Sequence, residues 1–409
     1  TSTGGGTTTG VDGTTGAGDS DTADVTGGPI FDVPNGDTSG IGACGCDLRY
    51  IWIANAQEGT VSKIDTASII EVGRYRTRED GAGDPSRTSV SLSGDVAVAN
   101  RAGGISKFFA QESDCVESNG MPGIQTSSGA GDVLAWNVEE CRAWYTEFPV
   151  TNQRPVAWTQ GSAAVDGCDS EGEKLWTVAS AAPGLGPGIG GFGGVNVYLL
   201  DGETGTIDNE LLVETFSGLQ LGAYGGAVDG EGDLWFSPMG GIDPGNPLTR
   251  VDVETFEVTH FPFPKGVASY GITVDHNGRI WVSSILGSGA ARFDPVTEVW
   301  DVLGGGVGAL GGLAEAQDNH MWIATEIGAV SYEIDTLAPG KVFVSPGGGG
   351  VKGISVDANG YIWAVNDRAW KIDPDTGLDV GVYDGLNGPY TYSDMTGWAL
   401  ANATCPPEG

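Results

Sequence analysis

Several arginine and tyrosine residues occupy positions from which they could bind an anion together. Arg87, Arg154, Tyr224 and Tyr270 each stand at, or just before, the start of a short segment that recurs along the chain. A guanidinium group binds a carboxylate or sulfate through paired hydrogen bonds, and a phenol adds a further donor. The same arginines could instead neutralise nearby aspartates or bond strand-end carbonyls, and both interpretations stay open. The residues expected at this ligand site also include Asn100, Arg101, Glu326, Asn366 and Arg368.

A second candidate is an acidic loop, residues 114–129, that is similar to a calcium-binding loop. Glu117 and Asn119 match ligand positions of such a loop, but Met121 stands where an aspartate is needed and Pro122 replaces the turn glycine. The loss of one charged ligand weakens a calcium site considerably. We therefore favour a loop without metal, with Ca²⁺ or Mg²⁺ as the alternative, and expect no other cofactor.

The elements that must position these residues follow a repeat. Gly271–Ser284 (GITVDHNGRIWVSS) contains two alternating strands around an Asp/Asn/Gly turn, which is typical of a β-hairpin. Related segments recur with tryptophans 46, 41 and 41 residues apart. A period of about 40–50 residues with several strands per unit indicates a β-propeller. Seven blades are predicted, centred on Trp52, Val96 or Val98, Trp176, Trp235, Trp281, Trp322 and Trp363.

The first blade lacks its innermost strand, and the segment Thr396–Cys405 (TGWALANATC) is expected to supply it, so that the C-terminus closes the ring. The fold class predicted is thus an all-β, seven-bladed propeller over residues 43–409, with an insertion at 110–140 in the second blade. An aspartate series that follows the third strands is expected to cap turns rather than bind calcium. Its members are Asp65, Asp252, Asp294, Asp335 and Asp373.

Residues 1–42 consist largely of Gly, Thr and Asp and have little to bury. We expect either a flexible tether, as from a lipid anchor, or an assembly strand donated to another copy.

The six cysteines lack the paired spacing of a zinc site and favour three disulfides in an exported protein. Cys44 or Cys46 is expected to bond Cys405 across the closing blade. The insertion cysteines Cys115 and Cys141 are expected to bond neighbouring blades, with Cys141–Cys168 the preferred second pair.

The chain is strongly acidic, with 54 Asp and Glu against 19 Lys and Arg and a net charge of −35. Such a surface repels nucleic acid and anionic lipid, so neither is an expected partner. No apolar run is long enough to span a bilayer. We therefore expect an extracellular or cell-surface protein whose partner is another copy of itself or another surface component.

The pattern G-[IL]-x-V-D-x-x-G-x-[IL]-W, followed by a basic residue, an apolar residue and Asp, resembles the streptogramin lyase (virginiamycin B lyase) and NHL-type propellers over about residues 46–405. The resemblance implies a magnesium site of His and Glu at the axis, with the Glu in a W-F-T-E variant of the tryptophan strand. Here the equivalents are WFSP, WVSS, WIAT and WAVN, and only Glu326 lies near that position.

The histidines argue against lyase chemistry. His276 and His320 fall in predicted hairpin turns and His260 on an outer strand, so none is expected to face the axis. No catalytic residue is assigned. The favoured interpretation is a non-catalytic scaffold or binding protein that could self-assemble through its N-terminal tail. The alternatives are an axial-face binder of a carbohydrate or small anion, or a metal-dependent enzyme of the lyase or lactonase type.

Overall fold

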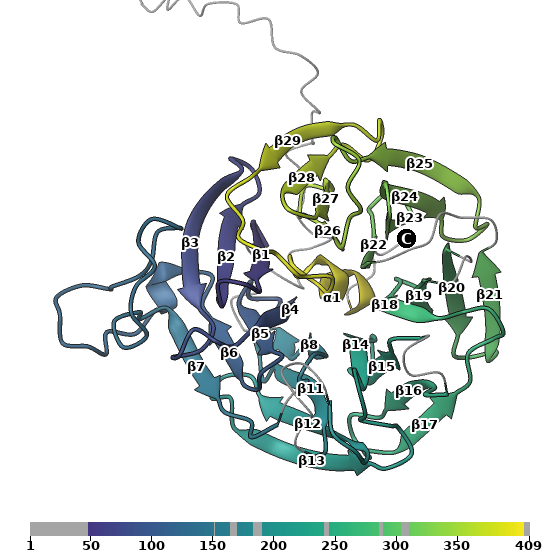
Figure 1. Cartoon of the computed structure of the whole chain (residues 1–409), viewed down its shortest axis with the longest axis horizontal. Helices are drawn as coiled ribbons and strands as arrows, with labels where there is room; N and C mark the ends of the chain where they lie inside the picture. The colour runs from purple at the N-terminus through teal and green to yellow at the C-terminus, as the bar shows by residue number, and fades with distance from the viewer. Residues whose placement is uncertain are drawn as a thin grey trace, which may run out of the picture. The chain divides into compact units, whose positions relative to one another are not determined.

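A ring of β-sheets makes up the part of the chain that the computed structural model describes, namely residues 48–150, 152–163, 170–182, 190–240, 245–285, 289–303 and 311–404. Seven antiparallel sheets surround a common axis, which confirms the predicted seven-bladed propeller (Figure 1). Residues 1–42, expected to form a tether or an assembly strand, lie outside the described residues. Within the described residues, no helix is long and apolar enough to cross a membrane.

The first three blades contain the insertion and a small extra hairpin. Blade one has β1 (Tyr50–Asn55), β2 (Thr60–Asp65) and β3 (Ile70–Arg76). Blade two has β4 (Pro85–Val90), β5 (Val96–Asn100), β6 (Ile105–Phe108) and β7 (Arg142–Thr146), with the short helix η1 (Glu112–Asp114) in the insertion. Blade three has β8 (Val156–Trp158), β11 (Lys174–Ser180), β12 (Val195–Asp201) and β13 (Ile207–Val213), beside the hairpin of β9 (Ser162–Ala163) and β10 (Ser170–Glu171).

Blades four to seven are four-stranded meanders in chain order. Blade four has β14 (Ala223–Val228), β15 (Leu234–Pro238), β16 (Leu248–Val251) and β17 (Val258–Phe261). Blade five has β18 (Ser269–Val274), β19 (Ile280–Ser284), β20 (Gly289–Asp294) and β21 (Val299–Leu303). Blade six has β22 (Leu313–Glu315), β23 (His320–Thr325), β24 (Gly328–Glu333) and β25 (Pro339–Val344). Blade seven has β26 (Gly353–Val356), β27 (Ile362–Val365), β28 (Ala369–Ile372) and β29 (Asp379–Tyr383).

The C-terminal part closes blade one, but not with the strand expected at Thr396–Cys405. Residues 389–395 run beside β1, where the Trp52 N–H donates to the Met395 carbonyl at 2.8 Å and the Tyr390 N–H donates to the Ala54 carbonyl at 3.0 Å. The chain then turns at Gly397, whose φ is +82°, and forms the helix α1 (Trp398–Thr404) near the axis (Figure 1). The sequence WALANAT is rich in the strong helix formers Ala and Leu, which explains why it is not a strand.

Buried tryptophans fill the spaces between the blades, and in three blades an aspartate of the same blade holds the tryptophan in place. In blades four, five and seven the indole N–H donates to an aspartate of the preceding turn at 2.7, 2.8 and 2.9 Å. These pairs are Trp235–Asp229, Trp281–Asp275 and Trp363–Asp357. Blade six has Ala316 in place of the aspartate, and the buried Trp322 indole N–H has no hydrogen-bond partner within the described ranges.

Blade two has no tryptophan on its second strand, and the prediction that Val96 or Val98 replaces it is off by one residue. Ala97 pairs with Lys107 across β5 and β6, in the register in which Trp363 pairs with Lys371 in blade seven. The side chain of Trp158, contributed by blade three, belongs to the same buried core cluster as Ala97. A large side chain from the neighbouring blade therefore helps to fill the interface beside the small alanine.

The turn-capping role predicted for the aspartate series is confirmed at four of five positions. The Oδ1 atoms of these four accept backbone N–H groups two and three residues further along the chain, at 2.7–3.1 Å. Asp335 is the exception, because Glu333 caps that turn by accepting the Thr336 N–H at 2.6 Å. The four capping residues are Asp65, Asp252, Asp294 and Asp373.

The disulfide pairing expected for the insertion is wrong. Cys115 bonds Cys141, so the bridge closes the insertion on itself instead of joining Cys141 to Cys168. Cys115 lies within the insertion and Cys141 directly follows it, and their Cα atoms are 4.5 Å apart, which is within the range that a disulfide spans. Cys168, Cys44, Cys46 and Cys405 lie outside the described residues.

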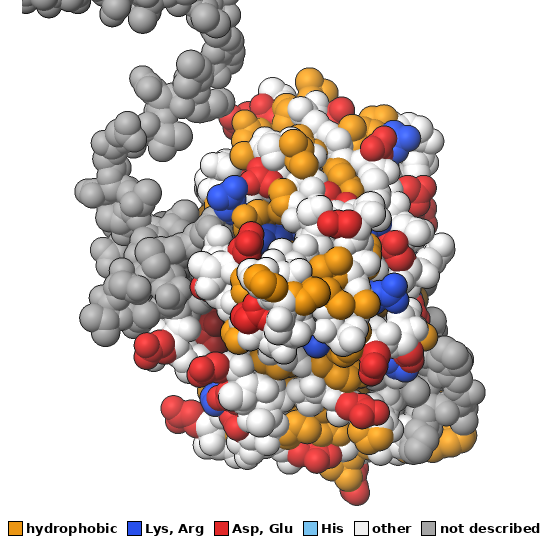
Figure 2. Space-filling view, turned by 90° about the vertical axis from the view of Figure 1, so that its left-hand side faces the viewer, with side chains coloured by type: hydrophobic (Ala, Val, Ile, Leu, Met, Phe, Trp, Pro, Cys, Tyr) orange, Lys and Arg blue, Asp and Glu red, His pale blue; other side chains and the backbone are white. Residues whose placement is uncertain are grey.

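Carboxylates are spread over the outside of the ring. Figure 2 shows one flank, where acidic side chains stand among apolar and uncharged ones and basic side chains are fewer. This distribution agrees with the excess of 54 acidic over 19 basic residues in the sequence. A concentration of positive charge anywhere on such a protein therefore calls for an explanation.

Candidate functional site

Four tyrosine side chains meet at one end of the axis, which we call the mouth. Tyr224 lies on β14 and Tyr270 on β18, while Tyr390 and Tyr392 belong to the closing segment beside β1. The Tyr390 hydroxyl oxygen lies 2.8 Å from that of Tyr224 and 3.4 Å from those of Tyr270 and Tyr392. We call these four residues the tyrosine cluster. The two tyrosines predicted from the sequence, Tyr224 and Tyr270, are thus brought together, with hydroxyl oxygens 3.2 Å apart.

Arg87 lies against this cluster and is only 1% exposed. Its guanidinium carbon is 3.2 Å from the centroid of the Tyr392 ring and 4.9 Å from that of Tyr224. Nη1 donates to the Ser86 carbonyl at 3.0 Å and Nη2 donates to the Tyr224 carbonyl at 2.9 Å. Nε has no hydrogen-bond partner among the described residues, and no carboxylate there forms an ion pair with Arg87. A buried cation without a counter-charge is costly in a protein interior.

Further cations surround the tyrosine cluster. Arg154 is 3% exposed, and its guanidinium carbon lies 5.0 Å from the centroid of the Tyr224 ring. Arg101 lies over Tyr390, with 4.7 Å between the guanidinium carbon and the ring centroid, and also pairs with Asp84. Lys352 places Nζ 5.6 Å from the centroid of the Tyr270 ring. The electron-rich faces of the rings favour these cations.

The pKa of Tyr390 differs in direction from those of the other three tyrosines of the cluster. Burial raises the pKa of Tyr224, Tyr270 and Tyr392. Burial acts on Tyr390 in the same direction, but the positive charge of Arg87 and the hydrogen bonds to the other three hydroxyls outweigh it and lower the pKa of Tyr390 to about 7. The mouth therefore stabilises one negative charge at the oxygen of Tyr390.

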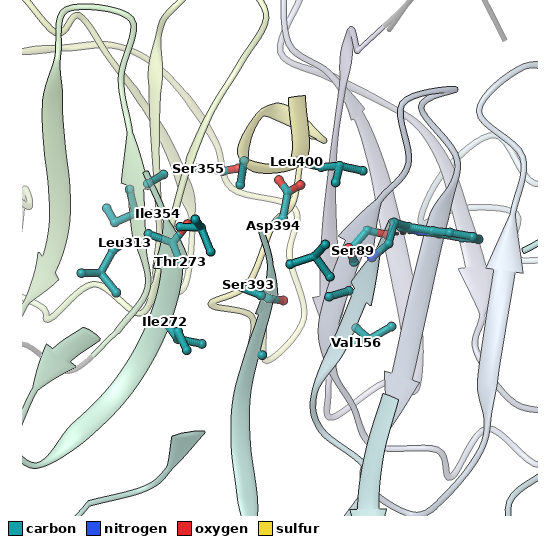
Figure 3. A pocket seen from close by; sticks show the side chains of 18 residues that line it. Ser89, Val156, Ile272, Thr273, Leu313, Ile354, Ser355, Ser393, Asp394 and Leu400 are labelled. Atoms are coloured by element: carbon teal, nitrogen blue, oxygen red, sulfur yellow. Dashed lines mark hydrogen bonds between the residues drawn. The ribbon is translucent and has the colours of Figure 1, made fainter. Parts of the chain in front are cut away.

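Below the mouth the axis contains a cavity of about 40 Å³. Figure 3 shows Ser89, Ser355, Ser393 and Asp394 around it, close to the helix α1. Asp394 Oδ1 accepts the N–H groups of Thr396 and Gly397 at 3.1 and 3.0 Å, and burial raises the pKa of this carboxyl to about 6. A cavity of this volume holds a few water molecules and is too small for an organic ligand.

The helix α1 lies at the other end of the cavity, which we call the floor. It is held by Glu315 at the end of β22, which is 5% exposed. The Glu315 carboxylate accepts the Asn402 side-chain amide at 2.6 Å and the His276 backbone N–H at 2.8 Å, and pairs with the His276 ring. The Trp398 indole N–H donates to the Glu315 carbonyl at 2.8 Å. The floor is thus a network of matched donors and acceptors.

The other residues predicted for the ligand site do not join the tyrosine cluster. Asn100 is fully buried and donates to the carbonyls of Thr77 and Gly104, so it holds a turn of blade two. Asn366 accepts the Arg368 N–H at 3.0 Å within the β27–β28 turn. Glu326 and Arg368 are exposed, and no contact found among the described residues links either of them to the cluster.

Two of the three histidines lie where the sequence predicted, while His320, expected in a hairpin turn, is the first residue of a strand. His276 is in the β18–β19 turn, His320 begins β23 and His260 lies on the outer strand β17. His260 bonds the hydroxyls of Thr249 and Thr215, at 3.0 and 2.7 Å. His276 bonds Glu315 at the floor and His320 bonds the Asp318 carbonyl, so none of these contacts reaches the tyrosine cluster.

The two residues predicted as metal ligands in the insertion cap their own turn. Glu117 accepts the Gly120 N–H at 2.9 Å and Asn119 accepts the Met121 N–H at 2.8 Å. The buried carboxylate that organises this loop is Glu140, because the backbone N–H groups of Ser118, Gln125 and Asn119 donate to it and lower its pKa. Across the described ranges, no three His, Cys, Asp or Glu side chains gather closely enough to hold a metal ion.

Sequence reasoning missed Tyr390, Tyr392 and Lys352. Lys352 precedes Gly353 just as Tyr270 precedes Gly271, so alignment of the repeats could have indicated it. Tyr390 and Tyr392 occur in a P-Y-T-Y segment outside any repeat. Because they are two residues apart, they would share one face of a strand. The sequence could have placed them in the site only if the closing segment had been assigned to residues 389–395.

Comparisons with known proteins support the fold. No family model and no curated protein matches the sequence. Among solved structures, a streptogramin B lyase superposes with a TM-score of 0.54 at 15% identity, covering 78% of this chain and 88% of that one. A functionally unknown protein from Desulfotomaculum acetoxidans superposes with a TM-score of 0.57 at 11% identity, covering 84% of this chain and 98% of that one. A catalytically inactive virginiamycin B lyase from Staphylococcus aureus, with quinupristin, superposes with a TM-score of 0.50 at 14% identity, covering 74% of this chain and 85% of that one. At such identities the resemblance to streptogramin lyases extends to the propeller fold alone.

Proposed function

We propose that this chain is an exported, non-catalytic binding protein whose axial mouth recognises an anionic group, a carboxylate or a sulfate. The observation that carries the proposal is Arg87, a buried guanidinium without a carboxylate partner among the described residues, beneath the tyrosine cluster. In a chain of net charge −35, positive charge collected at one point is a selective site for a small anion.

Different residues have different roles in this site. Arg87 is too deeply buried to touch a ligand, so it acts through its field and by polarising the tyrosine hydroxyls. Tyr390 and Arg101 are partly exposed and make the direct contacts. The Tyr390 hydroxyl donates a hydrogen bond to the anion while it is protonated, and Arg101 donates from its guanidinium. Above the pKa of Tyr390 the phenolate repels the anion, so binding weakens as the pH rises through about 7.

Export accords with the Cys115–Cys141 disulfide, since such bonds persist in oxidising compartments. The acidic groups of extracellular polysaccharides are ligands of the required chemistry. Self-assembly through residues 1–42 stays a prediction about residues outside those described, and it is compatible with a ligand site on the ring.

Calorimetric titration with sodium sulfate and sodium glucuronate, at low ionic strength and one pH unit below the pKa of Tyr390, tests this function. We expect wild-type protein to bind at least one of the two anions. Arg101→Gln should weaken binding at least tenfold, or about 1.4 kcal/mol. Arg368→Gln removes an exposed cation whose contacts do not reach the cluster, and it should leave binding unchanged. No binding by wild type, or equal loss in both variants, would contradict the proposal.

A further inference from the structure

A second concave site lies beside blade two, far larger than the axial cavity. A groove of about 600 Å³ runs between the turn after β3, the β5–β6 turn and the segments that flank β7. We call it the blade-two groove. Its volume is in the range of small-molecule sites, roughly 300–1,000 Å³. Each residue that lines it is described, and none belongs to the tyrosine cluster.

Two aromatic rings at right angles line the groove. The rings of Trp136 and Tyr145 have centroids 5.4 Å apart and an interplanar angle of 87°. Arg142 fixes the indole, because its guanidinium carbon lies 3.7 Å from the Trp136 ring centroid and Nη1 donates to the Trp136 carbonyl at 2.7 Å. Tyr145 lies on Gly104, where any larger residue would collide with its hydroxyl. The aromatic corner is therefore preorganised, which lowers the entropy cost of binding.

Polar groups of both signs line the rest of the groove. Arg78 and Asp80 form a bidentate pair at 2.9 and 2.6 Å, and Arg78 Nη1 also donates to the Ala102 carbonyl at 2.9 Å. These bonds use three of the five N–H donors of the guanidinium. Glu147 and Glu79 add exposed carboxylates to the lining. The groove thus offers donors and acceptors side by side, next to apolar ring faces.

We propose that the blade-two groove binds neutral sugar residues of a carbohydrate. The C–H face of a sugar ring packs on an aromatic ring, and its hydroxyls both donate and accept hydrogen bonds. Carboxylates such as Glu147 accept from sugar hydroxyls, and Arg78 donates to them. An anionic ligand would meet Glu79, Asp80 and Glu147 and is disfavoured, whereas a basic ligand is the competing occupant, because the lining carries three carboxylates and one arginine. The groove is independent of the axial mouth, so either site could bind without the other.

A glycan microarray carrying neutral and acidic oligosaccharides tests the proposal, with printed basic peptides on the same slide. We expect full-length protein to bind neutral glycans, and Trp136→Ala to lose at least tenfold in affinity when the best neutral glycan is titrated by calorimetry. Glu147→Ala, at an exposed position, should weaken binding without a folding defect. Phe192→Ala removes an aromatic residue that is 70% exposed elsewhere and is the matched control, expected to bind like wild type.

Three outcomes would overturn the carbohydrate proposal. These are the absence of neutral-glycan binding, binding that neither Trp136→Ala nor Glu147→Ala weakens, and retention of basic peptides alone. In the first of these outcomes, signals confined to acidic glycans and lost in Arg101→Gln would support the axial mouth. Conversely, neutral-glycan binding that survives Arg101→Gln supports the groove even if the axial mouth binds no anion.

Discussion

The buried charged groups at the two ends of the axis differ in whether they have partners. At the floor, the buried Glu315 carboxylate accepts hydrogen bonds from His276 and Asn402 and so holds the helix α1 in place. At the mouth, Arg87 is buried at least as deeply, yet no carboxylate among the described residues pairs with it. A charge that is matched within the fold stabilises structure, whereas a buried charge left unmatched beneath an accessible end can attract a ligand through its field.

The axial cavity is small. Residues of the helix α1 and of the inner strands line it, and its volume is only about 40 Å³. A ligand of ordinary size cannot enter, so recognition has to occur on the outer side of the tyrosine cluster. Tyr390 and Arg101, which are partly exposed, are the side chains positioned for it.

We expect the largest loss of stability from a substitution at the floor. Glu315→Ala removes the acceptor of the Asn402 amide and of the His276 groups, and we expect the free energy of unfolding to fall by about 3 kcal/mol. Urea unfolding followed by circular dichroism measures this loss. Glu326→Ala, at an exposed glutamate, is the control and should change stability by less than about 0.5 kcal/mol. An unfolding midpoint for Glu315→Ala equal to wild type would remove the structural role of the floor.

A smaller effect on stability is expected at the mouth. Arg87→Met keeps much of the side-chain volume and abolishes a buried charge, so we expect unfolding free energy within about 1 kcal/mol of wild type. Anion binding, in contrast, should be lost, and the pKa of Tyr390 should rise because Arg87 no longer favours the phenolate. The same urea unfolding and anion titration measure both. A loss of stability as large as that of Glu315→Ala would make Arg87 a structural residue like those of the floor.

The repeat made much of the fold predictable, and the reasons are visible in single residues. Trp235, Trp281 and Trp363 recur with an aspartate six residues earlier because that carboxylate accepts the indole N–H. Blade six shows the limit of the rule. It has lost both the aspartate, replaced by Ala316, and the basic residue opposite the tryptophan, replaced by Ser331, and still folds as a blade.

The candidate site was predictable where the repeat reaches it and not elsewhere. Tyr224 and Tyr270 start inner strands, so their convergence followed from the ring. Tyr390 was missed because the closing segment carries no repeat and its end was expected to be a strand where WALANAT forms a helix. The Cys115–Cys141 bond was missed because cysteine spacing alone does not determine pairing.

The most direct test of the unmatched charge at the mouth is the ultraviolet absorbance of ionised phenols, titrated with and without saturating sulfate. Our account predicts one phenol that ionises near pH 7 in wild type and is missing in Tyr390→Phe. Because the phenolate and the anion repel each other, sulfate should move that midpoint to higher pH, by the same coupling that weakens sulfate binding as Tyr390 ionises. If every tyrosine ionises near its ordinary pKa of about 10, or if sulfate leaves the midpoint unchanged, the mouth is not an anion site.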